Sequence, residues 1–173
     1  MLVTAASRHG STAEIAQAIA NALIGAGLDA EVIPPAEVAS VEEYDAVVLG
    51  SAVYTGHWLQ PAKALVARSG AALAGRPVWL FSSGPVGDPK RKLVRQMGVD
   101  PVDLPELLDR TGAQEHRVFA GKLEKRHLTV PQRTMLLVMR GLEGDFRDWA
   151  AIEGWALEIA QALRTSAAHG ARR

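Results

Sequence analysis

Short apolar runs alternate with helical patterns along the chain. Five runs are rich in apolar residues and bounded by turn residues, and we predict them to be strands: Leu2–Ala6, Ala30–Ile33, Ala46–Leu49, Val78–Phe81 and His116–Ala120. Alternation of such runs with helices is typical of βαβ units. The pattern therefore predicts an α/β fold with a doubly wound, mainly parallel sheet.

The helical periodicity is clearest after the first strand. Ile15, Ile19 and Leu23 fall on one helical face. At the start of this helix, Glu14 follows Ser11 by three residues. This spacing predicts a capping box with Ser11 at the N-cap and Glu14 at N3. Four further segments are predicted as helices: Trp58–Leu73, Lys90–Met97, Leu104–Leu108 and Trp149–Leu163.

These elements predict one domain. We expect it to span residues 1–165, with an insertion at 122–148 between the last strand and the last helix. The polar segment 166–173, which contains Ala and Gly, is expected to be a disordered tail.

Composition narrows the function classes. The chain has 173 residues, no cysteine, and 19 basic against 19 acidic side chains. Without cysteine there is no thiolate nucleophile, thiolate zinc site or cysteine-held iron–sulfur cluster, and we see no metal-ligand spacing among the histidines. A neutral chain has no electrostatic footprint for nucleic acid. No signal peptide and no apolar run of about 18 residues is found, so we expect a cytoplasmic protein.

The loop after the first strand has the chemistry of a phosphate site. Ligands of open parallel sheets bind beyond the carboxyl ends of the strands. Amide N–H groups and hydroxyls can form an anion cradle at the start of the following helix, and Gly10 permits a tight turn. The alternative is an ordinary capped turn. The loop lacks the Lys of a Walker A motif and is not GxGxxG. The candidate ligands are Ser7, Arg8, His9, Gly10, Ser11 and Thr12.

Two further loops follow the third and fourth predicted strands. In the first we interpret Tyr54 as a ligand-stacking side chain and Trp58 as core of the next helix. His57 is as compatible with proton transfer as with a solvated role. Backbone groups of both loops can border a flat ring. The candidates are Ser51, Ala52, Val53, Tyr54 and Gly56, then Ser83, Gly84, Pro85, Val86 and Gly87.

The insertion and two histidines are less specific. Basic residues flank an apolar stretch from Met135 to Met139. Such a segment can lie on an anionic membrane or cover an apolar patch, or it can pack as a helix on the domain edge. We expect a peripheral contact with the inner face of the cell membrane through 122–142 as one alternative. His116 and His127 are interpreted as structural or solvated.

Taken together, the motifs resemble the flavodoxin family. Ser7, Gly10 and Thr12 match its [Ser/Thr]-x-x-Gly-x-Thr phosphate loop. The order of motifs is more similar to the branch of menaquinone-dependent protoporphyrinogen IX dehydrogenases, over nearly the whole chain to about residue 164. The matching segments are Ser7–Ala16, Gly50 with Tyr54–His57, Ala120–Leu123 and Asp148–Ile152.

The resemblance implies a five-stranded sheet in the order 2-1-3-4-5 and FMN as the cofactor. It also implies an oxidoreductase of heme biosynthesis that passes electrons from a porphyrinogen or related small-molecule reductant through FMN to a quinone, with His57 as the candidate catalytic residue. Two alternatives remain: an electron-transfer flavodoxin that serves a protein partner, and a flavin-free binding module on the same fold. Whether the chain forms a homo-oligomer is left open.

Overall fold

The computed structural model describes residues 1–84, 100–123 and 144–170. Over these residues five parallel strands form a sheet in the order β2 (Glu31–Val32), β1 (Leu2–Ala6), β3 (Val47–Tyr54), β5 (Val78–Ser83) and β6 (Glu115–Phe119). Numbered by their own sequence order, these strands run 2-1-3-4-5. The predicted doubly wound α/β fold is confirmed.

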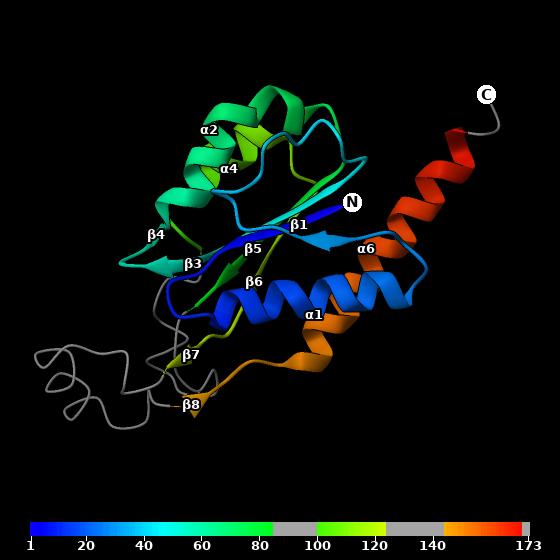
Figure 1. The fold of residues 1–173 in the computed structure, drawn as a ribbon. Helices are drawn as coiled ribbons and strands as arrows, with labels where there is room; N and C mark the ends of the chain where they lie inside the picture. The colour runs from blue at the N-terminus through cyan, green and yellow to red at the C-terminus, as the bar shows by residue number, and fades with distance from the viewer. Residues whose placement is uncertain (85–99, 124–143, 171–173) are drawn as a thin grey trace, which may run out of the picture.

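Helices cover both faces of this sheet (Figure 1). One face packs against α1 (Ser11–Gly25) and α6 (Trp149–Gly170), and the other against α2 (Gln60–Ala74) and α4 (Leu104–Thr111). A strand that is covered on both faces has to be apolar along its whole length rather than at alternate positions. All five residues of β1 are buried, and four of them are apolar; the exception is Thr4.

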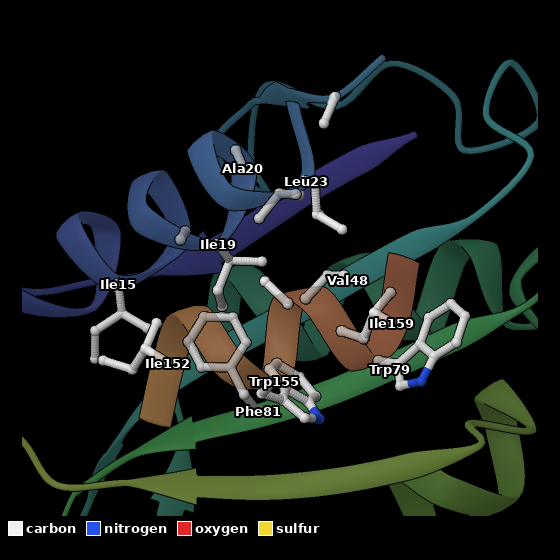
Figure 2. Packing of buried hydrophobic residues seen from close by; sticks show 14 of the residues in the cluster. Ile15, Ile19, Ala20, Leu23, Val48, Trp79, Phe81, Ile152, Trp155 and Ile159 are labelled. Atoms are coloured by element: carbon white, nitrogen blue, oxygen red, sulfur yellow. The ribbon is translucent and has the colours of Figure 1, made fainter. Parts of the chain in front are cut away.

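The core between the sheet and the α1–α6 pair is built around aromatic rings (Figure 2). The ring of Phe81, from β5, lies edge-on to that of Trp155, from α6, with 6.2 Å between the centroids. Figure 2 shows Ile15 and Ile19 of α1 and Ile152 of α6 gathered around Phe81. The helical periodicity that predicted these two helices therefore marks their buried faces.

The structure differs from the prediction most around the end of β3. The strand β3 continues past Gly50 to Tyr54, because Ser51 and Ala52 still pair with β5. A turn then leads into β4 (His57–Trp58), which pairs antiparallel with β3 and was not expected. Trp58 accordingly lies in β4 and precedes the helix that it was predicted to begin.

The disordered tail predicted from residue 166 is wrong over 166–170, because α6 continues to Gly170. Alanines favour helix there, and the hydroxyls of Thr165 and Ser166 donate to carbonyls one turn back, at 3.0 and 3.1 Å. The predicted helix Lys90–Met97 lies outside the described residues. The insertion is described only at its base, where β7 (Lys122–Leu123) pairs antiparallel with β8 (Gly144–Asp145).

Candidate functional site

The three predicted loops leave the same edge of the sheet. Ala6 at the end of β1 is paired with Ser51 of β3, and Ser51 with Ser82 of β5. The carboxyl ends of these three neighbouring strands therefore lie side by side. This is the edge at which open α/β sheets bind their ligands.

The first loop turns into α1 through a glycine. Gly10 has φ +88° in the left-handed region and occupies the N-cap of α1. The first N–H groups of a helix have no intrahelical partner, and here no side chain caps them either. Ser11 Oγ is buried without a hydrogen-bond partner. Unsatisfied donors at the positive end of a helix are the chemistry that an anion requires.

The predicted capping box is wrong. The helix starts one residue earlier than the box requires, with Gly10 rather than Ser11 at the N-cap. The carboxylate of Glu14 is engaged elsewhere, because it accepts a hydrogen bond from Arg147 Nη1 at 2.7 Å. A buried cation thus outcompetes the backbone N–H for this carboxylate.

Arg147 fastens the base of the insertion to the start of α1. Its side chain is only 3% exposed and also donates to the carbonyl of Ser11 at 3.1 Å and to both carboxylate oxygens of Asp145. Its guanidinium lies 4.4 Å from the ring centroid of Trp149. These partners hold the pKa of Arg147 above its ordinary value, with the Asp145 hydrogen bond the largest cause.

The second loop is the tip of the β3–β4 hairpin, and it meets the first loop. Thr55 and Gly56 both have positive φ and form the turn. The guanidinium of Arg8 lies 5.3 Å from the ring centroid of Tyr54, and the ring of His9 approaches the same ring edge-on at 6.5 Å. Two segments that we predicted to share a site are therefore in contact.

His57 is held by a carboxylate that sequence reasoning missed. Its Nδ1 lies 3.1 Å from Oδ1 of Asp103, which also receives Lys63 Nζ at 3.1 Å, while Oδ2 accepts the backbone N–H of Trp58 at 2.8 Å. Burial raises the pKa of Asp103, but these three donors outweigh it and hold the pKa below its usual value.

Below the hairpin, a buried polar chain links three strands. Trp58 is 3% exposed, as expected of a core residue, and its Nε1–H donates to Ser82 Oγ at 2.8 Å. The same oxygen lies 2.8 Å from His116 Nε2, and His116 Nδ1 is 3.4 Å from Asp100. Of the two roles considered for His116, structural or solvated, these contacts favour the structural one. His127 lies outside the described residues.

Some of the remaining predicted site residues lie at this edge of the sheet, and others lie outside the described residues. Ser51 is fully buried, and its hydroxyl donates to the carbonyl of Ala52 and accepts the N–H of Leu59, so only its backbone stays a candidate. Gly84, with φ +135°, lies against Val53, which brings the second and third loops together. Ser83 is buried beside them. Pro85, Val86 and Gly87 lie outside the described residues.

A cavity of about 670 Å³ lies at the opposite edge of the sheet. Met1, Glu31 and Tyr44 are among its lining residues, and they come from the amino ends of the strands. Its position separates it from the three loops. No helix in the described part of the chain is long and apolar enough to cross a membrane.

The sequence itself decides the family. Residues 2–149 match the family model of the flavodoxin domain. The chain belongs to the flavodoxin domain family. A search of curated proteins found no match for this flavodoxin-family chain. The family model identifies the flavodoxin domain and does not distinguish branches within it.

Solved structures agree on the fold of this flavodoxin-family chain. A flavodoxin from the domain Archaea superposes with a TM-score of 0.64 at 18% identity, covering 94% of this chain and 97% of that one. The flavodoxin of Streptococcus pneumoniae TIGR4 gives 0.58 at 20%, covering 93% and 97%. Rubredoxin oxygen:oxidoreductase from Desulfovibrio gigas gives 0.61 at 16%, and the match covers 95% of this chain but 36% of that enzyme.

Proposed function

We propose that this chain binds FMN at the carboxyl edge of its sheet and acts as an FMN-dependent oxidoreductase. The observation that carries the proposal is the start of α1. There an uncapped helix end, a glycine turn and the unpartnered, buried Ser11 Oγ leave donors for a phosphate group. Family membership supports FMN as the molecule that brings the phosphate.

The residues around this point fit the cofactor in a consistent way. Ser7, Gly10, Ser11 and Thr12 would hold the phosphate, with Arg8 adding positive charge. The loop at Tyr54 and Gly56 would border the ring on one side, and Ser83 with Gly84 on the other. FMN, when bound, supplies the redox chemistry. The chain's own part is to orient the ring, exclude water and move a proton, for which His57 is the candidate.

A comparison of FMN with riboflavin tests the phosphate site. Riboflavin has the same ring without the phosphate, so titration of either flavin by fluorescence quenching isolates the phosphate contribution. We expect FMN to bind at least about tenfold more tightly, since charge-assisted hydrogen bonds contribute about 1.5–3 kcal/mol each. Equal affinity for the two flavins, or binding of neither, would refute the proposal.

Ser11→Ala sharpens this experiment, because it removes the unpartnered hydroxyl and no other contact. We expect about a tenfold loss of FMN affinity with no change for riboflavin. Ser166→Ala is the matched control, since Ser166 lies near the far end of α6. A similar loss in the control would mean that the effect is not local.

We further propose that the reductant is a porphyrinogen and the acceptor a quinone. The segments Ser7–Ala16 and Tyr54–His57 support this through their resemblance to the protoporphyrinogen dehydrogenase branch. Oxidation of protoporphyrinogen IX with menadione as acceptor tests it directly. Turnover that depends on FMN is expected, and its absence in flavin-loaded protein would remove this substrate.

The second candidate is an electron carrier that serves a protein partner. Superposition with flavodoxins over nearly their full length favours it, whereas the net charge of zero gives little electrostatic steering. Flavin-loaded protein that exchanges electrons with redox proteins but turns over no small molecule would select this candidate.

A further inference from the structure

His57 and Asp103 form a carboxylate–imidazole pair at the tip of the β3–β4 hairpin. An ionised carboxylate only accepts hydrogen bonds, and the lowered pKa of Asp103 keeps it ionised at neutral pH. The contact of 3.1 Å between Nδ1 and Oδ1 therefore requires a proton on Nδ1. In a neutral imidazole the other nitrogen, Nε2, then carries the lone pair.

The geometry presents that lone pair away from the carboxylate. The two ring nitrogens lie on opposite sides of the imidazole, so Nε2 is turned from Asp103. The side chain of His57 is half exposed, whereas that of Asp103 is 13% exposed. His57 is also the cross-strand partner of Tyr54, and such partners share a face of the hairpin. The basic nitrogen thus lies on the face that carries the predicted ring-stacking side chain.

Asp103 is itself fixed in place. The amide of Val102 donates to the carbonyl of Gly56 at 2.8 Å, while Asp103 accepts the backbone N–H of Trp58 and the ammonium of Lys63. On the other side, Asp100 faces His116. The segment 100–103 therefore ties the hairpin to the body of the domain and leaves the carboxylate little freedom.

We propose that Asp103 is a positioning residue, which holds His57 in the Nδ1–H tautomer so that Nε2 accepts a proton from the substrate. The inference deepens the proposed function and rests on it for the identity of the reaction.

A substrate oxidised by two electrons loses a hydride equivalent, which FMN takes up when bound, and a proton, which needs a base. Nε2 of His57 takes the N–H proton of the substrate and becomes the imidazolium, whose charge Asp103 balances. The proton then passes to water. The quinone acceptor takes the two electrons with two protons, one that came with the hydride and one from water.

The tautomer is measured by ¹⁵N NMR of the imidazole nitrogens in the full chain. The spectrum is recorded without flavin at about pH 8.5, where an ordinary imidazole is neutral, and His57→Gln identifies the signals. We expect Nδ1 to be protonated in wild type. A wild-type spectrum dominated by the Nε2–H form overturns the inference even if no variant can be purified.

Asp103→Asn keeps the size of the side chain but leaves one acceptor oxygen for the Trp58 amide, so the Nδ1–H fraction should fall to a minority. Glu106→Gln is the matched control. It removes a carboxylate from the first turn of α4, and this carboxylate contacts Arg110 rather than His57. Unchanged tautomers in Asp103→Asn would contradict the proposal.

Flavin-loaded protein supplies the second readout. We expect His57→Gln and Asp103→Asn to lower the rate of substrate oxidation by at least about 100-fold, the usual range for loss of a general base, with FMN affinity unchanged. If His57 has the Nδ1–H tautomer but the chain binds no FMN, the proposed function is refuted and the tautomer assignment stands. FMN binding with the opposite tautomer would refute this inference alone, and unchanged rates in His57→Gln would remove the proton-transfer role.

Discussion

Gly50 has no side chain, and the ring of Phe81 occupies the space that a Cβ would fill. A Cβ built there would lie 2.2 Å from ring carbons of Phe81, and the rings of Phe119 and Trp155 pack against Phe81 and restrict its movement. From the sequence we interpreted Gly50 as the end of a strand. Its true role depends on a ring from the neighbouring strand, which no local pattern reveals.

Gly50→Ala should therefore destabilise the protein by about 1–3 kcal/mol, the usual cost of overpacking a core. Urea denaturation followed by circular dichroism measures the free energy of unfolding. Gly154→Ala is the control, since nothing lies within 4 Å of the added Cβ and the position is inside α6, so a gain of about 0.5–1 kcal/mol is expected. Equal stability of wild type and Gly50→Ala would show that the Phe81 ring can yield.

The site residues that could be predicted are close together in the sequence, and those that were missed are far apart. Ser7, Gly10, Ser11 and Thr12 lie next to one another, so a strand, a turn and a helix start were enough to indicate their chemistry. Asp103 lies 46 positions from His57, and Arg147 lies 133 positions from Glu14. A single sequence offers no signal for pairs at such separations, and their contacts come from the way the sheet winds.

At the scale of elements, Arg147 joins β8 to the first turn of α1. Its almost fully buried guanidinium donates hydrogen bonds to Asp145, Glu14 and the Ser11 carbonyl. The same turn carries the unpartnered Ser11 hydroxyl. The order of this turn therefore depends on a strand that comes from the far end of the sequence.

Arg147→Ala should cost about 1.5–3 kcal/mol of unfolding free energy, because it removes an almost fully buried guanidinium together with its charge-assisted hydrogen bonds to Asp145 and Glu14. Arg110→Ala is the control. Its ion pair with Glu106 is exposed and spans four residues of α4, and such pairs contribute about 0.5 kcal/mol or less. Thermal denaturation of both variants distinguishes them, and an equal shift in melting temperature would contradict the role given to Arg147.

The elements themselves were predicted to different degrees. The strand β1 has the predicted bounds, because a short apolar run between polar turns has few alternatives. The strand β3 is longer than predicted, since the small side chains of Ser51 and Ala52 give no apolar signal and pairing with β5 extends the strand. Tertiary pairing here overrides local preference.

For the whole molecule, His116 links stability to pH. Burial lowers the pKa of His116 below its usual value, and this outweighs the opposite effect of the carboxylates of Asp100 and Glu115. The unfolded chain therefore binds a proton at a higher pH than the folded chain does. It follows that the free energy of unfolding is greatest above about pH 6.5 and falls as the pH drops toward the folded-state pKa.

Urea denaturation at pH 7.5, 6.5 and 5.5 checks this expectation. The slope with pH should be smaller in His116→Gln, whose amide can still bond to Ser82. The lowered pKa values of Asp103 and Asp145 act below the ordinary value of 3.8 and do not interfere in this window. Parallel slopes in wild type and His116→Gln would assign the dependence to other groups.

The β7–β8 pair joins the two ends of the chain segment between residues 123 and 144. Leu123 and Gly144 are direct antiparallel partners, so the chain returns to the point from which it departs. The segment between these partners can therefore be replaced by a short turn. A two-residue Asn-Gly connector spans such a pair, and a shorter loop lowers the entropy cost of closure. A variant in which Asn-Gly replaces residues 124–143 should fold cooperatively, and its circular dichroism melt would show this directly.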